Sequence, residues 1–248
     1  MKETLRIAAI ADVHGNLGAL EAVLSHIRRI SSPDLIVNLG DHVSGPLQPR
    51  ETADLLMSVP QIAIRGNHDR ELLEGSSETG SVDRYAADQL DSSHLCWLGG
   101  LDATAWIEKN IFLCHGTPGS DIEYFLENPN DLGSDPATEE QVAGRAGQCP
   151  ASLILCGHSH IPRAVRLSDG RLIVNPGSVG IPAYMRAWQH PQELAGGAPH
   201  TRYALLTHTR DWRVELIQVD YDWQGACRLA ASRGRLDWAK VLAGHFGR

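Results

Sequence analysis

The chain has 248 residues, of which 42% are hydrophobic, so it is long enough to bury a sizeable core. Its formal net charge is −8 and it has no long run of Lys or Arg, which argues against nucleic-acid binding through a broad basic face. The five cysteines form no CxxC pair, which argues against a disulfide framework and against a zinc–thiolate site.

The N-terminal stretch MKETLRIAAIADVHG has neither the pattern of a signal peptide nor that of a membrane anchor. Arg6 interrupts its apolar run, and Asp12 ends the run well short of a signal-peptide core or a membrane span. The unpaired cysteines fit a reducing compartment. We therefore expect a cytoplasmic protein that does not bind membranes.

The first part of the chain has the pattern of an α/β protein. Leu5–Ala11 has the composition of a buried strand, and six apolar residues then recur at helical spacing: Leu17, Leu20, Val23, Leu24, Ile27 and Ile30. A second strand is expected at Asp34–Leu39, a helix at Pro49–Ser58 and a third strand at Gln61–Arg65. Strand, helix, strand order implies parallel pairing with a right-handed crossover.

Later segments have the pattern of antiparallel strands. We expect two hairpins and two further strands: Ala103–Ile107 with Ile111–Cys114, Arg163–Leu167 with Leu172–Asn175, then Tyr203–His208 and Trp212–Val219. Antiparallel pairs after a parallel start indicate a mixed sheet, or two packed sheets with helices outside.

Two features mark the end of the chain. The segment Ile181–His200 contains three prolines and two adjacent glycines, which indicates an irregular loop or a lid over a site. A surface helix is expected at about 235–246. The sequence has no internal repeat and no linker composition, so we expect residues 1–248 to form a single domain.

Polar residues follow the predicted strands at the same point each time. They form six segments: Asp12-Val13-His14, Gly40-Asp41, Gly66-Asn67-His68-Asp69, His115-Gly116, Gly157-His158-Ser159-His160 and Asn175-Pro176-Gly177-Ser178. Strand ends in α/β sheets converge on one edge, where loops build a binding crevice. Any one of these segments alone is more often a turn or a structural histidine. Their shared position relative to the strands indicates one common site.

This ordered set resembles the signature of the calcineurin-like metallophosphoesterase superfamily. The resemblance runs from Asp12 to Ser178, about two thirds of the chain. It is similar above all to the small bacterial and archaeal phosphoesterase branch, in which segments like Cys114–Pro118 (CHGTP) and Asn175–Gly180 (NPGSVG) occur. The resemblance implies an α/β fold, specifically a four-layer α/β/β/α sandwich with two mixed β-sheets and two metal ions at the strand ends.

The resemblance also assigns the metal ligands. It places one ion on Asp12, His14, Asp41 and His160. It places the other on Asp41, Asn67, His115 and His158, so that Asp41 bridges the two ions. Carboxylate and amide oxygens mixed with imidazoles suit divalent or transition ions such as Mn, Fe or Zn. Two divalent ions outweigh the two aspartates, so the centre would attract phosphate.

The function that the resemblance implies is that of a metal-dependent phosphoric ester hydrolase, acting on a phosphodiester or a phosphomonoester. A hydroxide bridging two ions ~3.5–4 Å apart would attack phosphorus. His68 would be the catalytic proton donor, and Asn67 and His68 would contact the substrate. The expected partner is a small phosphate ester or a nucleotide, and a homodimer is a further expectation. Dinucleoside polyphosphate hydrolysis, protein phosphatase activity and a non-catalytic interaction scaffold are the alternatives.

Two segments depart from the related Ser/Thr protein phosphatases and from the wider family. The phosphatase motif GDxxDRG supplies an aspartate that orients the catalytic histidine and an arginine that binds phosphate, whereas residues 40–45 here are GDHVSG. This argues against a protein phosphatase and leaves His68 without an assigned partner. After NPGSVG the family often has a Pro-Arg pair, but Ile181–Tyr184 is IPAY, and Arg186 is the candidate to compensate.

Overall fold

The computed structural model describes residues 4–75, 82–130, 133–181 and 199–244. In this part of the chain the strands form two five-stranded sheets and a separate hairpin. The first sheet has the order β12 (Trp212–Val219), β11 (Thr201–His208), β1 (Leu5–Ile10), β2 (Leu35–Asn38) and β3 (Ile62–Ala63). The second has the order β4 (Thr104–Ile107), β5 (Ile111–Cys114), β8 (Leu153–Leu155), β10 (Leu172–Asn175) and β9 (Arg163–Arg166). The hairpin is β6 (Glu127–Asn130) with β7 (Gly133–Pro136).

Both sheets are mixed. In the first, β1 pairs in parallel with β2 and β2 with β3, whereas β11 lies antiparallel to β1 and to β12. In the second, β8 lies in parallel between β5 and β10, and antiparallel strands β4 and β9 close the two edges. The carboxyl ends of β1, β2 and β3 therefore lie at one end of the first sheet, and those of β5, β8 and β10 lie at one end of the second.

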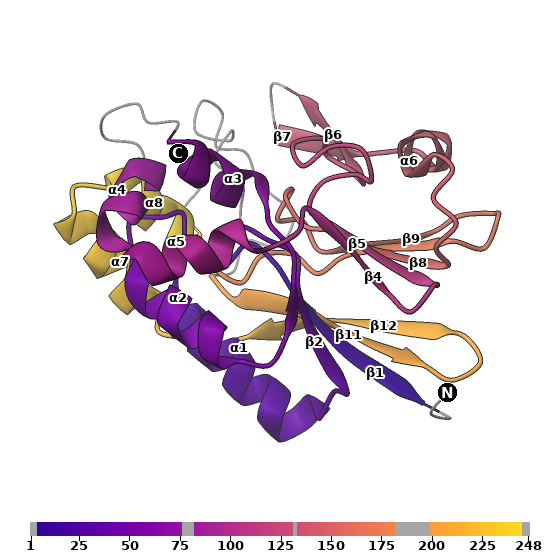
Figure 1. Ribbon diagram of the computed structural model, residues 1–248, viewed down its shortest axis with the longest axis horizontal. Coiled ribbons are helices and arrows are strands. Elements are labelled where there is room, and N and C mark those ends of the chain that lie inside the picture. The colour runs from indigo at the N-terminus through magenta and orange to yellow at the C-terminus, as the bar shows by residue number, and fades with distance from the viewer. Residues whose placement is uncertain (1–3, 76–81, 131–132, 182–198, 245–248) are drawn as a thin grey trace.

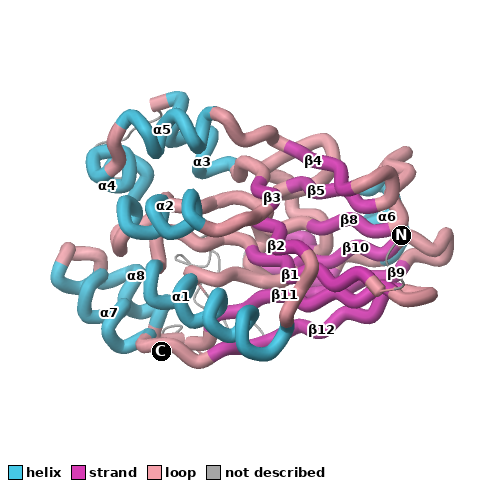
Figure 2. The backbone as a smooth tube through the Cα atoms, turned by 60° about the horizontal axis from the view of Figure 1, so that its bottom comes forward, coloured by secondary structure: helices cyan, strands magenta, loops and turns pink. Residues whose placement is uncertain are grey.

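The helical segments are α1 (Leu17–His26), a π-helical turn η1 (Ile27–Ser31), α2 (Pro49–Ser58), α3 (Asn67–Glu74), α4 (Val82–Gln89), α5 (Ser92–Gly99), α6 (Glu139–Ala146), α7 (Trp223–Ser232) and α8 (Leu236–Leu242). In Figure 1, α1 and α2 lie outside the first sheet, and α6 lies outside the second. Helices α3, α4, α7 and α8 gather at the carboxyl ends of β1 and β2, an arrangement that Figure 2 shows from another side.

Side-chain alternation explains the layers. In β1, Ile7 and Ala9 face the second sheet, while Ala8 and Ile10 pack against α1. Strand β8 alternates in the same way, with Leu153 and Leu155 between the sheets and Ile154 toward α6. Strands covered on both faces have continuous apolar sequences. The predicted four-layer α/β/β/α sandwich with two mixed sheets is therefore confirmed.

Several boundaries differ from the sequence-based prediction. The third strand is only two residues long, and the first helix changes to π-helical geometry at Ile27. The C-terminal helix ends at Leu242 instead of about residue 246, and it is not a simple surface helix because Trp238 and Leu242 are buried. Helices α3 to α7 and the β6–β7 hairpin were not predicted. The predicted lid lies largely in residues 182–198, outside the described residues, and Arg186 lies there too.

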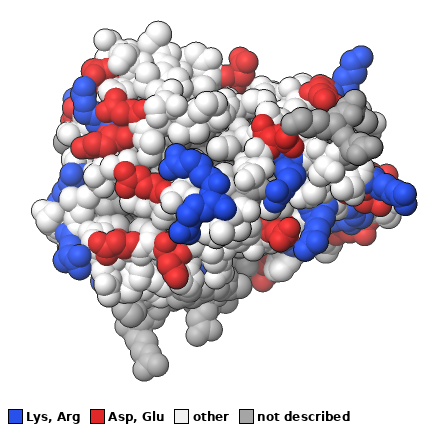
Figure 3. Space-filling view, turned by 90° about the horizontal axis from the view of Figure 1, so that it is seen from below, with Lys and Arg blue, Asp and Glu red and all other residues white. Residues whose placement is uncertain are grey.

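The apolar length of the helices and the charges on the surface complete the description of the fold. No helix among the described residues is both long and apolar enough to cross a membrane. On the face drawn in Figure 3, acidic and basic side chains are interspersed.

Candidate metal centre

The predicted polar segments lie together at the carboxyl ends of the strands. Backbone hydrogen bonds continue past the strand ends: the Asp12 N–H donates to the Gly40 carbonyl (3.0 Å), and the Gly157 N–H donates to the His115 carbonyl (2.7 Å). This interlocking brings loops from both sheets into one cluster. The seven side chains predicted as ligands are all at most 3% exposed: Asp12, His14, Asp41, Asn67, His115, His158 and His160.

One group of donor atoms comes from Asp12, His14 and His160, and these atoms lie within 4.8 Å of one another. The Nε2 atoms of His14 and His160 are 3.2 Å apart, and His160 Nε2 is 3.5 Å from Asp12 Oδ1. Two nitrogens that share one ion, each about 2.1 Å from it, are separated by about 3.0–3.4 Å, depending on the coordination angle. The group therefore has the spacing of a metal site.

A second group consists of Asp41, His115 and His158, again with donor atoms within 4.8 Å of one another. Asn67 adjoins it, because its Oδ1 lies 3.2 Å from His115 Nε2. Asp41 Oδ2 is 3.3 Å from His115 Nε2 and 3.7 Å from His14 Nε2. The Asp41 carboxylate thus lies between the two groups, where a bridging ligand would be.

Hydrogen bonds to the backbone orient three of these imidazoles. Each ring donates one N–H to a carbonyl oxygen: His14 Nδ1 to Ser44 (2.8 Å), His115 Nδ1 to Leu39 (2.6 Å) and His158 Nε2 to Ile122 (3.0 Å). A carbonyl can only accept, so the other ring nitrogen of each neutral imidazole carries the lone pair. That is the tautomer a metal ligand requires, since metal-binding histidines are commonly held by such a second bond.

The backbone at the centre is strained. Seven non-glycine residues in the described part of the chain have a positive φ, and five of them are predicted ligands: Asp12 (55°), His14 (48°), Asp41 (56°), His158 (67°) and His160 (60°). This left-handed region costs an L-residue roughly 1–2 kcal/mol. Such strain is typical of functional sites, where the surrounding structure enforces it.

Glycines allow the loops to approach this closely. A Cβ on Gly66 would overlap the Asp41 carboxylate, and one on Gly180 would overlap the Val13 carbonyl. Gly157 does not need a positive φ, but its Cβ would lie 3.0 Å from the Ala11 Cβ. The glycines of these motifs therefore make room for the loops that carry the ligands.

The buried carboxylates fit a cation. Asp12 Oδ2 and Asp41 Oδ2 have no hydrogen-bond partner among the described residues, although both side chains are fully buried. Burial opposes their ionisation, but the facing histidines, chiefly His160 for Asp12 and His115 for Asp41, lower the pKa of both carboxyl groups. An ionised carboxylate in the interior is costly unless a positive charge accompanies it.

The histidines show where that positive charge is favoured. Burial lowers the pKa of His14 and of His158 to about 4, so both rings are neutral at pH 7. Burial also opposes a charge on His115, but the Asp41 and Asp12 carboxylates outweigh it and raise the pKa of His115 to about 10. The two carboxylates therefore favour a positive charge beside Asp41. A metal ion that binds there would displace the proton of His115.

Comparison with known proteins identifies the family. A family model for calcineurin-like phosphoesterases matches residues 5–162. The chain belongs to the calcineurin-like phosphoesterase family. It is thus a metal-dependent phosphoester hydrolase, and the two groups of side chains described above are its candidate metal-binding residues.

Individual relatives extend the similarity over the whole chain. An uncharacterized protein of Methanocaldococcus jannaschii is 26% identical over 94% of this chain and 94% of its own. A metallophosphoesterase from Sphaerobacter thermophilus is 27% identical, with a TM-score of 0.76 over 97% of this chain and 99% of that one. A proposed diadenosine tetraphosphatase shares the fold, with 16% identity and a TM-score of 0.53 over 87% of this chain and 94% of its own.

A buried carboxylate supports the loops of this calcineurin-like phosphoesterase. The Asp69 carboxylate accepts hydrogen bonds from the backbone N–H groups of Asp41 (2.9 Å), His42 (3.0 Å) and Gly66 (3.0 Å). It also lies 2.7 Å from His42 Nδ1. One carboxylate therefore ties the loop that carries Asp41 to the loop that carries Asn67.

The partner of His68, which the sequence did not identify, is Asp83 in α4. His68 Nδ1 lies 3.1 Å from Asp83 Oδ1 and 3.8 Å from Glu71 Oε2. Burial disfavours a charge on His68, but the carboxylates of Asp41, Asp83 and Glu71 outweigh it and raise the pKa of His68 to about 9. No spacing rule links residue 83 to residue 68, so only the packing of α4 could have revealed this pair.

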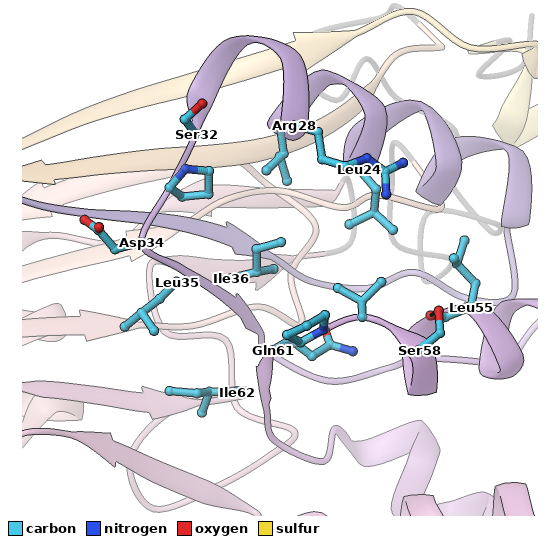
Figure 4. Close-up of a pocket in the computed structure, with 14 residues that line it drawn as sticks. Leu24, Arg28, Ser32, Asp34, Leu35, Ile36, Leu55, Ser58, Gln61 and Ile62 are labelled. Atoms are coloured by element: carbon cyan, nitrogen blue, oxygen red, sulfur yellow. Dashed lines mark hydrogen bonds between the residues drawn. The ribbon is translucent and has the colours of Figure 1, made fainter.

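A cleft of about 550 Å³ opens beside the metal groups, and its lining includes Asn67, His68, Glu71, Tyr124, Arg145 and His158. It is several times larger than a phosphate group, so it leaves room for the rest of an ester. A wider cavity of about 700 Å³ lies between α1, β2 and the α2–β3 turn (Figure 4). Its lining has no histidine and a single carboxylate, Asp34, so it lacks the groups that phosphoryl chemistry needs.

Proposed function

We propose that this chain hydrolyses a phosphodiester or a phosphomonoester at a dinuclear centre. The proposed ligands of the first ion are Asp12, His14, Asp41 and His160. Those of the second are Asp41, Asn67, His115 and His158. The observation that carries the proposal is the convergence of these buried donors around two carboxylate oxygens that have no other partner among the described residues. When bound, two divalent ions would lower the pKa of a water molecule and stabilise charge on the phosphoryl oxygens.

The protein's own residues would handle the leaving group. His68 lines the cleft, and because its Nδ1 faces Asp83, its Nε2 is the atom that would face the ester. A pKa of about 9 keeps this ring protonated at neutral pH. His68 would therefore donate a proton from Nε2 to the departing oxygen, a role that contributes about 10²–10⁴-fold in rate. Asn67 lines the same cleft and would contact the substrate.

Hydrolysis of a dinucleoside polyphosphate is a second candidate, favoured by the volume of the cleft beside the ligands. The non-catalytic scaffold is less well supported, because it does not require His68 to face the same cleft as the metal groups. A protein phosphatase is disfavoured by the absence of the aspartate and arginine of GDxxDRG.

The test is a hydrolysis panel of phosphomonoesters, phosphodiesters and dinucleoside polyphosphates, assayed with Mn²⁺, Zn²⁺ or Fe²⁺. We expect turnover of at least one ester class and a loss of about 10²-fold or more in His68→Ala with its bound metal retained. His208→Ala is the control, because His208 lies in β11 and packs against Trp212, away from the ligands. Bound metal without cleavage of any ester would favour the scaffold instead.

A further inference from the structure

We propose that Asp83 positions His68 for catalysis, and that helices α7 and α8 hold Asp83 in place. The inference rests on the proposed hydrolase function. Its first support is the direct contact: His68 Nδ1 lies 3.1 Å from Asp83 Oδ1, with the His68 side chain 19% exposed and that of Asp83 13% exposed. A carboxylate only accepts, so the contact fixes the proton on Nδ1 and sets the plane of the ring.

Ser44 connects this pair to the metal groups. Its hydroxyl donates to Asp83 Oδ1, and its backbone carbonyl accepts from His14 Nδ1 at 2.8 Å. Ser44 itself is fully buried. The His14 and His68 rings pack edge to face, with centroids 5.5 Å apart. A single residue therefore fixes both the carboxylate behind His68 and the predicted metal ligand beside it.

Glu71 is the other carboxylate near His68, but it is less suited to orient the ring. Its Oε2 lies 3.8 Å from His68 Nδ1, beyond hydrogen-bonding distance. Its Oε1 accepts from Asn67 Nδ2 at 3.4 Å, and it lies 3.6 Å from the Arg70 guanidinium. Asp83 is thus the carboxylate that holds His68.

Packing on both sides of α4 holds Asp83 in place. Val82, the preceding residue, belongs to a buried cluster with Trp238 and Leu242 of α8. Ala86, one turn later, packs in a different cluster with Leu72 of α3. These contacts leave α4 little freedom to shift, so the position of the Asp83 carboxylate is set by apolar packing rather than by a loop motif.

Helix α7 adds a polar clamp to the same assembly. The Arg233 guanidinium, just after α7, lies 5.1 Å from the centroid of the Tyr85 ring in α4. Its Nη1 also donates to the Pro46 carbonyl at 2.7 Å, in the loop that contains Ser44. Both α7 and α8 lie beyond residues 5–162, the span that matches the family model. The C-terminal helices therefore support a part of the site that the family motifs do not supply.

The test compares Asp83→Asn with Asp88→Asn, the same change in the same helix at a side chain that is 55% exposed. Hydrolysis is measured for one ester with an acidic phenol as leaving group and one with an alkyl alcohol. We expect Asp83→Asn to lower kcat for the alkyl ester by about 10–100-fold and for the phenyl ester by less than about 3-fold, since proton donation matters only for the poor leaving group. Asp83→Glu should recover part of the loss, and His68→Ala/Asp83→Asn should be no slower than His68→Ala alone.

A second measurement does not depend on activity. Long-range ¹H–¹⁵N spectra of the zinc-loaded protein report the protonation and hydrogen bonding of both ring nitrogens of His68. We expect a hydrogen-bonded Nδ1–H in the wild type, a changed Nδ1 signal in Asp83→Asn and an unchanged one in Asp88→Asn. Equal losses on both esters, loss of a metal ion in Asp83→Asn, or unchanged His68 signals would each overturn the inference. A wild type that cleaves no ester but shows the expected His68 signals would instead overturn only the proposed hydrolase function.

Discussion

At the scale of single residues, the candidate metal centre depends on side chains outside the proposed ligand set. The Asp69 carboxylate accepts hydrogen bonds from three backbone N–H groups and faces His42 Nδ1. The groups around it therefore require an acceptor at this position. Hydrogen bonds to a charged group contribute about 1.5–3 kcal/mol, and an unpaired buried donor costs about 1–3 kcal/mol. The loops of Asp41 and Asn67 therefore need a carboxylate here.

Replacing Asp69 with Asn tests this. The amide NH₂ group would face backbone donors, so we expect a loss of about 2–4 kcal/mol in the free energy of unfolding and weaker metal binding. Urea denaturation and metal titration measure the two effects. Asp88→Asn in α4 is the control for the loss of one charge, and equal behaviour of the two variants would refute the role assigned to Asp69.

Glu127 in β6 predicts a pH dependence. It is only 2% exposed, and burial raises its pKa to about 7, although Ser159, Arg163 and Arg145 oppose the shift. A carboxyl group with a raised pKa stabilises the fold fully below its unfolded pKa of 4.5 and loses that contribution as the pH rises to about 7.

Glu127→Gln mimics the protonated acid at every pH. Relative to this variant, the wild type should lose on the order of 3 kcal/mol of unfolding free energy between pH 4.5 and pH 7.5. The measurement is urea denaturation of both proteins at the two pH values, which cancels the pH dependence of their shared metal ligands. A difference that stays constant with pH would show that Glu127 has the same pKa in the folded and unfolded states.

At the scale of elements, the strands of the sandwich can be predicted from the sequence, whereas the positions of the helices at the carboxyl ends of β1 and β2 cannot. Continuous apolar runs in β1 and β8 specify two covered faces, and this pattern is readable in the sequence. The placement of helices α4 and α8 depends on tertiary contacts such as Val82 with Trp238.

Arg233→Ala probes this packing directly. It removes the contact with the Tyr85 ring and the hydrogen bond to the Pro46 carbonyl, so we expect a loss of about 1–3 kcal/mol in the free energy of unfolding. The Asp83 carboxylate should also be less well held, with a few-fold slower cleavage of alkyl esters. Arg228→Ala, at a 73% exposed side chain of α7, is the matched control. Identical thermal melts for the two variants would show that the Arg233 contacts do not stabilise the fold.

At the scale of the whole molecule, the strand pattern predicted a mixed sheet or two packed sheets, and the motifs that follow the strands predicted one common site, because strand ends meet at one edge. The four-layer sandwich and the seven ligand candidates were implied by the family resemblance of those motifs. The sequence did not predict Asp83, since that contact depends on how α4 packs and not on a spacing. Nor did it predict the left-handed backbone at His158 and His160. A single domain over residues 1–248 stays a prediction, supported by the pairing of β11 with β1 across some 200 residues.

The central claim is that two ions share the Asp41 carboxylate, with His158 on one ion and His160 on the other. Metal content per chain, measured by mass spectrometry after purification without chelators, tests it most directly. We expect about two ions in the wild type and in His208→Ala, about one in His158→Ala or His160→Ala, and almost none in Asp41→Asn or in the double variant His158→Ala/His160→Ala. A wild type with no bound ion, or a double variant that keeps as much metal as either single variant, would contradict the account.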